Sequence, residues 1–369
     1  MKIGIDARLI EETGVGRYIR NLIDHLSTLD TKNQYVIFLR KKSYPAFALP
    51  NSRWEKRLAD VSWHSVAEQF FMPWILVKEH LDLVHIPYFN VPIFYPGKFI
   101  VTIHDLTILH YDTGKATTLP VFLYKLRRAG YFIALSVGLI RAKAIIAVSE
   151  TTKKEIIDHF QIPSEKITVT YEGVESVLST KSKVQSNKKR LIEGPYFLYV
   201  GNAYPHKNLE ALLLAFQRFI TRHTSPFFLV LVGKDDYFYR NIKAESDRLE
   251  LTKNVIFYGY ADDEALVNLY THALALVVPS FMEGFGLPPL EALAYGCPVI
   301  CSNIPVFHEI LGDIPIYFDP SNPQSLAGVL LKTEKNLFRV DEKKVNMLLK
   351  RYNWTDMANE TLRLYNASI

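Results

Sequence analysis

The sequence lacks several features that define common classes of protein. Its 369 residues include only two cysteines, Cys297 and Cys301, and no second pair that could complete a zinc site. The longest apolar run, Gly130 to Ile140, is too short to span a bilayer, and Asp6 stands where a signal peptide would need its apolar core. We therefore expect a cytoplasmic protein with two buried, reduced thiols and no membrane-spanning helix.

The chain also lacks a large excess of charge of either sign. Lys and Arg number 43 and Asp and Glu 38, for a net charge of +5, and no nucleic-acid-binding module accompanies this surplus, so no nucleic-acid partner is expected. No acidic residue lies between Asp112 and Glu150, whereas six basic residues lie there among aromatic and aliphatic ones: Lys115, Lys125, Arg127, Arg128, Arg141 and Lys143. Two interpretations of this basic stretch stay open: the solvated face of a helix, or a surface for phosphorylated molecules or anionic lipid.

What the chain does have is length and apolar content enough for two domains. Short β-rich runs alternate with longer helical patterns at 1–178 and again at 195–345, and a polar, basic linker at 179–194 separates the two series. The runs are compact and apolar, as in a parallel sheet that helices cover on both faces. This pattern predicts an α/β protein with two Rossmann-like, doubly wound domains that face each other across a cleft. The tail from Val345 to Tyr365 is expected to be helical, and the C-terminal segment 346–369 is expected to cross back to the first domain.

One segment has the composition of a phosphate-binding loop. From Val278 to Gly296 the chain reads as a strand, a glycine-rich loop and a helix, with the sequence VPSFMEGFGLPPLEALAYG. Gly284 and Gly286 let the backbone approach a ligand, and free N–H groups at the start of the helix attract an anion such as a diphosphate. Glu283 and Glu291 flank these groups and are placed to accept hydrogen bonds from the hydroxyls of a sugar or ribose. The alternative is that Glu291 only balances the helix dipole and Glu283 is solvated.

This segment resembles the E-x7-E signature of the retaining glycosyltransferases of family 4, which have the GT-B fold. Glu283 and Glu291 enclose the seven residues that the signature requires. The resemblance extends along almost the whole chain, through the motifs Thr13–Arg17, Ile103–Leu106, Ala147–Glu150 and Val200–Asn208. It implies that the first domain presents an acceptor and that the second holds a nucleotide-sugar donor.

The resemblance also implies three catalytic residues. Glu283 contacts the hydroxyls of the donor sugar, and Lys207 binds the donor diphosphate, where a fixed cation stabilises the charge that the leaving group gains. His104 is expected beside the donor sugar at the reaction centre. From its position at the end of an apolar strand alone, His104 could equally have a buried partner. Many relatives carry an Arg at the position of Asn202, so the neighbouring His206 is the candidate for a second donor contact.

Further donor contacts are expected from backbone and loop positions. Gly14 and Gly16 resemble a flexible loop that closes under the donor phosphates, before a helix that starts at Arg17. Gly259 and Tyr260 resemble the backbone that holds the nucleobase. The remaining expected contacts are Gly284, Phe285, Gly286, Leu287 and, for the ribose, Glu291. No metal-binding D-x-D pattern is evident, so neither a metal nor a cofactor is expected.

These observations predict a retaining hexosyltransferase of cell-surface polysaccharide synthesis. Its motifs look most like those of bacterial mannosyltransferases, which favours GDP-mannose as the donor and a saccharide or lipid-linked saccharide as the acceptor. Peripheral contact of the basic stretch with the inner face of an anionic membrane is one expectation. Two alternatives stay open: a nucleotide-sugar epimerase of the same architecture, and a non-catalytic subunit that binds sugar nucleotides.

Overall fold

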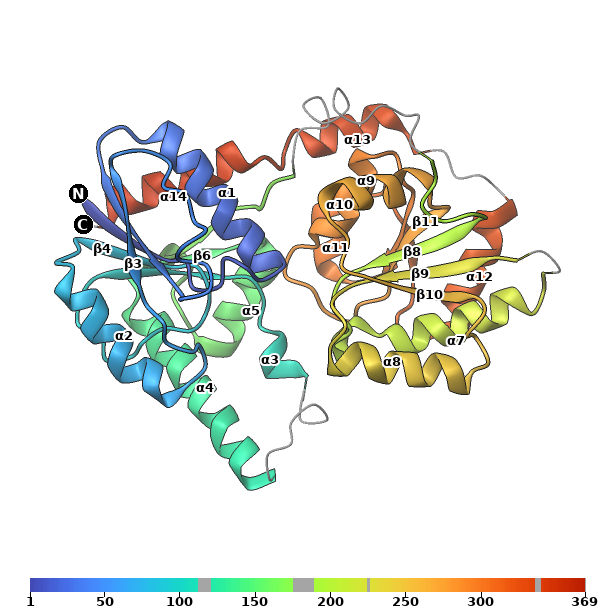
Figure 1. Cartoon of the computed structure of the whole chain (residues 1–369), viewed down its shortest axis with the longest axis horizontal. Coiled ribbons are helices and arrows are strands. Elements are labelled where there is room, and N and C mark those ends of the chain that lie inside the picture. Colours follow the sequence, from blue (N-terminus) through green and yellow to red (C-terminus); the bar gives the residue numbers. More distant parts are fainter. Residues whose placement is uncertain (112–120, 175–188, 224–225, 336–339, 369) are drawn as a thin grey trace. The chain divides into compact units, whose positions relative to one another are not determined.

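The chain forms two compact units, shown in Figure 1. The computed structural model describes residues 1–111, 121–174, 189–223, 226–335 and 340–368. The first unit comprises Met1–Leu109, Thr118–Gly173 and Asn353–Ile369, and the second comprises His110–Thr117 and Val174–Tyr352. Most of the expected linker at 179–194 lies outside the described residues, and so does Lys115 of the basic stretch.

The first unit is built on a seven-stranded parallel sheet with the strand order β3-β2-β1-β4-β5-β6-β7. Strands β4 and β5 are buried at every position, which is why they read as continuous apolar runs in the sequence. The strands are β1 (Lys2–Asp6), β2 (Gln34–Leu39), β3 (Trp54–Leu58), β4 (Leu83–Ile86), β5 (Phe99–Ile103), β6 (Ala144–Ala147) and β7 (Ile167–Val169).

Helices cover both faces of this sheet. Figure 1 shows α1 (Gly14–Leu29) and α14 (Trp354–Ala367) on one face, and α2 (Val66–Lys78), α4 (Val121–Arg141) and α5 (Glu150–Phe160) on the other. Two short elements, α3 (Thr107–His110) and η2 (Ser164–Lys166), complete the unit among the described residues. Helices α1 and α14 pack against each other, so the prediction that the C-terminal helix returns to the first domain is confirmed.

The second unit repeats the same plan with six parallel strands in the order β10-β9-β8-β11-β12-β13. One core of buried residues packs the strands against a helix layer, with Phe197 and Leu231 on the strands and Phe216 on a helix. The strands are β8 (Tyr196–Val200), β9 (Phe228–Val232), β10 (Val255–Gly259), β11 (Ala275–Val278), β12 (Val299–Ser302) and β13 (Ile316–Phe318).

The helices of the second unit also lie in two layers. One layer holds α7 (Leu209–Ile220), α8 (Tyr237–Arg248) and α12 (Pro323–Lys335), and the other holds α9 (Asp263–His272), α10 (Leu287–Ala294) and α11 (Pro305–Leu311). Helix α13 (Glu342–Leu349) packs on α10, and the short η3 (Pro205–Lys207) follows β8. The prediction of two Rossmann-like, parallel-sheet domains is therefore confirmed.

Two predicted helix boundaries are wrong. Helix α1 begins at Gly14 and not at Arg17, because the Arg17 N–H already donates to the carbonyl oxygen of Thr13 at 3.1 Å and closes a helical turn. The single helix expected from Val345 to Tyr365 is two helices, α13 and α14. Asn353 breaks it, since its extended backbone and its side chain, which accepts a hydrogen bond from the backbone N–H of Asp356, start a new helix.

The two cysteines lie inside the second unit, as predicted. Cys297 and Cys301 are buried free thiols, and burial raises the pKa of Cys297 to about 12. Among the described residues, no helix is long and apolar enough to cross a membrane.

The strand orders place one topological switch point in each sheet. It lies between β1 and β4 in the first unit and between β8 and β11 in the second, where successive strands run outward in opposite directions. Ligands of doubly wound sheets bind beyond the carboxyl ends of the strands at such points. The residues that follow these four strands are therefore the first place to look for a site.

Candidate active site

An ion pair occupies the switch point of the second sheet. Lys207 lies in η3, after β8, and Glu283 lies in the loop after β11. The Lys207 Nζ donates to both carboxylate oxygens of Glu283, at 2.8 and 2.7 Å, and the Ser280 hydroxyl donates to Glu283 Oε1 at 2.7 Å. The two charged side chains are 16% and 15% exposed. A cation and a carboxylate thus sit together, partly open to solvent, at the position where a ligand is expected.

The backbone around the ion pair fixes the two loops to each other. Phe281 N–H donates to the carbonyl oxygen of His206 at 2.8 Å, and the Asn208 side-chain amide donates to the carbonyl oxygens of Pro279 and Pro320. Asn208 adopts a left-handed conformation, with φ of 58°, which turns the chain from η3 into α7. The loops that carry Lys207 and Glu283 are therefore joined by one backbone hydrogen bond and by the Asn208 side chain.

The glycine-rich loop leads into α10 as the sequence suggests, but with fewer donors than expected. Gly286 takes φ of +96°, and a Cβ there would lie 2.8 Å from the Phe307 ring, so only glycine fits. Pro288 and Pro289 occupy the second and third positions of the helix and have no N–H. The start of α10 is a weaker anion site than a full set of N–H groups would make. Lys207 is left as the main positive group beside it.

The other expected contacts of the second unit divide into buried and accessible groups. Gly284, Phe285, Leu287 and His206 are buried, and Phe285 packs edge-on against Tyr352. Tyr260 is 83% exposed, after Gly259, whose φ is +81° and whose carbonyl accepts from the Gly233 N–H. Asn202 lies in the loop between β8 and η3 and is partly exposed.

Glu291 lies on α10 and has a hydrogen-bond partner. The Tyr270 hydroxyl, from α9, donates to Glu291 Oε2 at 3.1 Å. This bond orients one oxygen of the carboxylate, a group that accepts hydrogen bonds from hydroxyls. A ribose hydroxyl is one group of suitable chemistry.

In the first unit, His104 has the buried partners that its strand-end position allowed. Its Nδ1 lies 2.8 Å from Glu172 Oε1, and its Nε2 lies 3.1 Å from the carbonyl oxygen of Pro87. Both ring nitrogens of His104 therefore contact protein atoms. The Tyr18 ring stands edge-on at 4.9 Å between ring centroids. Glu172, after β7, is a residue that the sequence analysis missed, because no motif surrounds it.

Gly14 and Gly16 lie in the first turn of α1 and not in a loop before it. A Cβ on Gly14 would meet nothing within 4 Å, whereas one on Gly16 would collide with Ile10. The expectation of a flexible glycine loop is therefore wrong for these positions. The N-terminus of α1 after β1 remains at the switch point of the first sheet.

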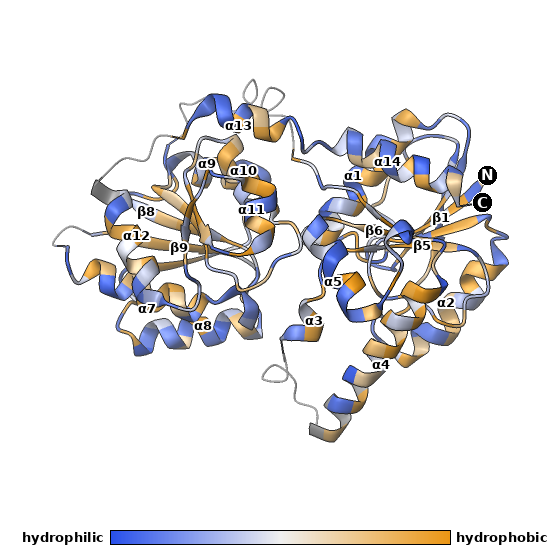
Figure 2. Ribbon diagram, turned by 180° about the vertical axis from the view of Figure 1, so that it is seen from behind, coloured by the Kyte–Doolittle hydropathy of each residue, from blue (hydrophilic) through white to orange (hydrophobic). Residues whose placement is uncertain are grey.

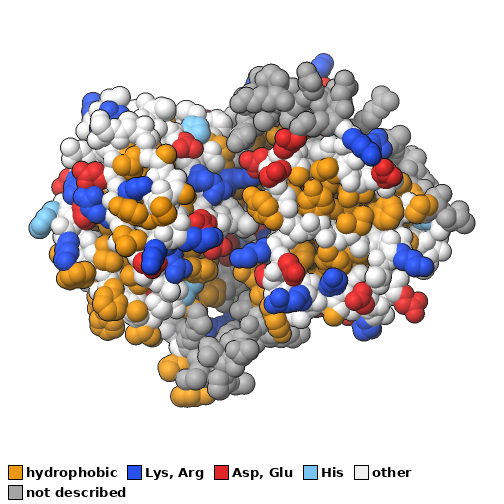
Figure 3. Space-filling view, viewed as in Figure 1, with side chains coloured by type: hydrophobic (Ala, Val, Ile, Leu, Met, Phe, Trp, Pro, Cys, Tyr) orange, Lys and Arg blue, Asp and Glu red, His pale blue; other side chains and the backbone are white. Residues whose placement is uncertain are grey.

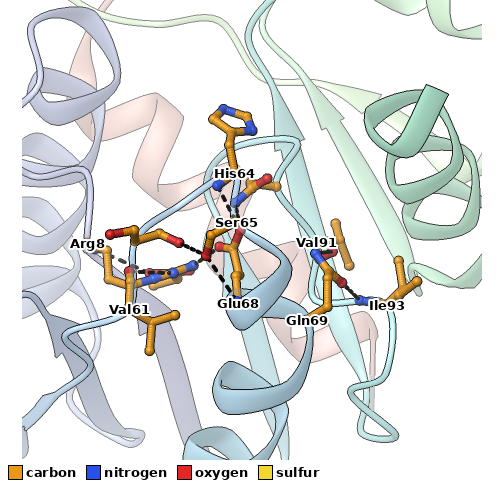
Figure 4. Close-up of polar contacts among 11 residues, drawn as sticks. Arg8, Val61, His64, Ser65, Glu68, Gln69, Val91 and Ile93 are labelled. Atoms are coloured by element: carbon orange, nitrogen blue, oxygen red, sulfur yellow. Dashed lines mark hydrogen bonds and ion pairs between the residues drawn. The ribbon is translucent and has the colours of Figure 1, made fainter. Parts of the chain in front are cut away.

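A buried charge network fills that switch point, as Figure 4 shows. Arg8, just after β1, donates to both oxygens of Asp6 at 2.8 and 2.6 Å and to Glu68 at 2.6 Å. Glu68, in the first turn of α2, also accepts from the backbone N–H of His64 and from the Asn90 amide. The Arg8 and Glu68 side chains are 3% and 0% exposed. Burial raises the pKa of Glu68, and the guanidinium of Arg8 opposes that shift.

No metal site accompanies these groups in the part of the chain that the structure describes. There, no cluster of three or more His, Cys, Asp or Glu side chains could hold an ion. Lys207 is the positive group at the second switch point that could neutralise phosphate charge.

Two protein families together match nearly the whole chain. Residues 13–177 match Glycosyltransferase Family 4, and residues 181–348 match Glycosyl transferases group 1. The boundary between the two matches falls where the linker was expected.

Two curated relatives are enzymes of O-antigen synthesis. The chain is 28% identical over 327 residues to O-antigen chain mannosyltransferase RfbU of Salmonella typhimurium, covering 87% of this chain and 84% of the relative. It is 29% identical over 303 residues to O-antigen chain mannosyltransferase B of Escherichia coli, covering 79% and 76%.

A solved structure has the same fold along the full length. Sucrose-phosphate synthase from Thermosynechococcus elongatus superposes with a TM-score of 0.75 at 18% identity and covers 100% of this chain and 98% of that chain. At this identity the likeness concerns the fold alone, which is GT-B.

Proposed function

The chain belongs to the glycosyltransferases, with a family 4 domain followed by a group 1 domain, and we propose that it is a retaining hexosyltransferase. It moves a hexose from a nucleotide-diphosphate sugar to a saccharide or lipid-linked saccharide acceptor. The observation that carries the proposal is the ion pair of Lys207 and Glu283 at the switch point of the second sheet. This pair supplies one group for phosphate and one for sugar hydroxyls.

Donor binding exchanges the partners of this ion pair. Without a ligand, Lys207 and Glu283 satisfy each other. An arriving donor places its diphosphate against the Lys207 ammonium, and the hydroxyls of its sugar donate to the Glu283 carboxylate. Glu291, already oriented by Tyr270, accepts from the ribose. The nucleotide thus replaces an internal ion pair with charge-assisted contacts of its own.

We propose a front-face reaction rather than a covalent intermediate. The bond between the anomeric carbon and the phosphate oxygen breaks, the acceptor oxygen bonds to that carbon from the same side, and its proton passes to the departing phosphate oxygen. Glu283 is poorly suited to act as a nucleophile in this complex, because the donor's sugar hydroxyls and the Ser280 hydroxyl donate to its oxygens. Lys207 stabilises the negative charge that develops on the leaving diphosphate.

The first unit supplies His104 in this proposal. Glu172 and the Pro87 carbonyl contact the two nitrogens of the imidazole and fix the ring in one orientation. The reaction needs no metal and no cofactor, since Lys207 does the electrostatic work of a cation.

GDP-mannose is the preferred donor in our proposal. Support comes from the two relatives described as O-antigen chain mannosyltransferases, which match over most of this chain. By the same analogy the product belongs to cell-surface polysaccharide.

We also propose peripheral contact between the first unit and an anionic membrane at its cytoplasmic face. Exposed aromatic side chains gather on α2, on the loop after β4 and on α4: Phe70, Phe71, Trp74, Phe94 and Phe122. Figure 3 shows hydrophobic side chains over α2 and over the end of α4. The Lys78 ammonium lies 3.2 Å from the centre of the Trp74 ring, a pairing suited to an anionic interface. A Trp74→Ala variant should float with phosphatidylglycerol vesicles less than wild type, and equal flotation contradicts this contact.

The transfer reaction itself is tested with radiolabelled GDP-mannose and a lipid-linked saccharide acceptor. Product formation and an anomeric configuration equal to that of the donor, read by NMR, are the expected results. Conversion of the donor without acceptor identifies an epimerase instead. Donor binding with no turnover in the presence of several acceptors identifies a non-catalytic subunit.

A further inference from the structure

A pocket in the first unit has no role in the chemistry described so far. It has a volume of about 490 Å³ and is lined by residues of α3, α4 and α5, together with Phe89. That volume lies within the ~300–1,000 Å³ typical of small-molecule sites. Its lining comes from the first unit alone.

The pocket combines apolar lining residues with basic ones. Phe89, Tyr131 and Ile133 contribute to the walls, and Lys125, Arg128 and His159 carry the basic groups. No aspartate or glutamate is among its lining residues. This composition suits a ligand with both a hydrocarbon part and a negative charge.

Several of the lining residues are held in place by the fold. Phe89 and Tyr131 pack around the His64 ring, with centroids 5.3 and 4.7 Å away, and the His64 backbone donates to Glu68 of the buried network. Arg128 donates to the carbonyl oxygen of Leu109 at 2.9 Å, which fixes one cation at the edge. The site is therefore built from supported side chains.

The pocket is also continuous with apolar surface. Ile133 is 55% exposed and Phe132, which also lines the pocket, is 49% exposed. Figure 2 shows hydrophobic stretches along α4 and along its neighbour α2. A hydrocarbon chain longer than the pocket can leave along this surface.

We propose that this pocket binds a phosphate carried on a hydrocarbon chain, with the phosphate at Lys125 and Arg128 and the first part of the chain against Ile133. The proposal rests on the proposed function, because it assigns the acceptor's lipid anchor to the first unit. The same chemistry has two sources: the phosphate that links a saccharide to its lipid, and the headgroup of a membrane phospholipid.

The direct test is calorimetric titration of the full chain with farnesyl phosphate. Farnesol and inorganic phosphate are titrated separately as controls, since farnesol has only the hydrocarbon chain and inorganic phosphate only the charged group. Farnesyl phosphate should bind at least about tenfold more tightly than either, since charged and apolar contacts both contribute. Equal binding of farnesol and farnesyl phosphate overturns the proposal.

Matched variants locate the binding. Lys125→Ala and Ile133→Gln should each weaken farnesyl phosphate binding about threefold to tenfold. The controls are Lys154→Ala on α5 and Ile140→Gln on α4. Both residues are exposed and do not line the pocket, so these changes should alter the affinity for farnesyl phosphate less than twofold. Equal losses in both pairs contradict a site in this pocket.

Two further measurements are needed. One distinguishes the two sources of the phosphate, and the other distinguishes failure of the pocket proposal from failure of the proposed function. Dihexanoyl phosphatidylglycerol, below its micelle concentration, reports on headgroup binding. If farnesyl phosphate binds and this phospholipid does not, the ligand of the pocket is the lipid phosphate of the acceptor. If only the phospholipid binds, the ligand is a membrane phospholipid. Thermal stabilisation by GDP-mannose in the same samples reports on the second unit. If GDP-mannose does not stabilise the protein, the proposed donor is contradicted and the proposal for the pocket is not. If GDP-mannose stabilises the protein but neither lipid binds, the proposal for the pocket is contradicted and the proposed donor is not.

Discussion

The two units share one topology and use their switch points differently. In the second unit, Lys207 and Glu283 form an ion pair that is 16% and 15% exposed. In the first unit, Arg8 and Glu68 form one that is 3% and 0% exposed and is completed by Asp6 and Asn90. The first network is enclosed by protein, while the second keeps access to solvent. Solvent access, rather than fold or charge type, separates a structural ion pair from one that can exchange partners with a ligand.

The energetic consequence follows from desolvation. A buried ion that loses its partner keeps its desolvation penalty without compensation, and the folded state is destabilised. A partly exposed ion that loses its partner is solvated by water or binds a ligand instead. Changes at the first switch point should therefore appear in stability, and changes at the second in turnover.

The largest effect is expected from Arg8→Met. It leaves the Asp6 and Glu68 carboxylates buried without their cation, which should lower the free energy of unfolding by about 3–5 kcal/mol. Arg363→Met, which breaks an exposed pair with Glu360, serves as the control and should cost less than about 1 kcal/mol. Denaturant unfolding measures both. If the two variants lose similar amounts of unfolding free energy, the ion pair at the first switch point is not the buried, structural pair described above.

Next comes Lys207→Ala, which should cost about 3 kcal/mol of transition-state stabilisation, or roughly a 100-fold loss of turnover. Its thermal midpoint should stay close to that of wild type, because Glu283 retains Ser280 and solvent. The exposed Lys243→Ala on α8 is the control, and steady-state rates are the measurement. A stability loss as large as that of Arg8→Met would make this pair structural too.

A pH dependence should come from the first unit. Burial, with a smaller contribution from His104, lowers the pKa of His85 to about 3, where its ring binds the Tyr365 and Thr102 hydroxyls. Between pH 6.5 and 3 the unfolded chain then binds the proton and the folded chain does not, so stability falls as pH falls, by up to about 1.4 kcal/mol per pH unit. Unfolding of wild type and His85→Gln from pH 7 to pH 4 measures this. Parallel curves would show that His85 is not the source.

The smallest effect is expected from Tyr270→Phe in the second unit. Loss of its hydrogen bond to Glu291 should weaken donor binding by about 1 kcal/mol, roughly fivefold, with the rate at saturating donor unchanged. Tyr258→Phe, on β10, provides a control with the same chemical change. If the saturated rate falls and affinity does not, Glu291 acts in the chemistry and not in ribose binding.

Much of the second site could be predicted from local sequence. Gly286 and the strand–loop–helix pattern around Glu283 are continuous in the chain, and Lys207 follows β8 after a short loop. The pairing of Lys207 with Glu283 depends on the adjacency of β8 and β11, which are far apart in the sequence. The two prolines of α10 are visible in the sequence. Their lack of N–H groups weakens the anion site only because the helix starts at Leu287, and that start is known from the structure.

The first unit was harder to predict because tertiary contacts decide its details. Helix α1 starts at Gly14 in spite of the low helix propensity of glycine, and Gly16 in its first turn packs closely against Ile10, which is not its neighbour in that helix. Glu172 meets His104 across β5, β6 and β7, with no sequence motif to announce it. The Arg8 network joins β1, α2 and the loop after β4 in the same way. Long-range partners of this kind follow from topology and not from local pattern.

The most direct test of the account is a thermal-shift panel of GDP-mannose, UDP-glucose, UDP-galactose, UDP-N-acetylglucosamine and dTDP-rhamnose on wild type and Lys207→Ala, with and without EDTA. A ligand that binds only the folded state raises its stability. The account predicts that one nucleotide sugar stabilises wild type equally with and without EDTA, and that Lys207→Ala loses this stabilisation. Equal stabilisation of both proteins would contradict the claim that the second switch point binds the donor.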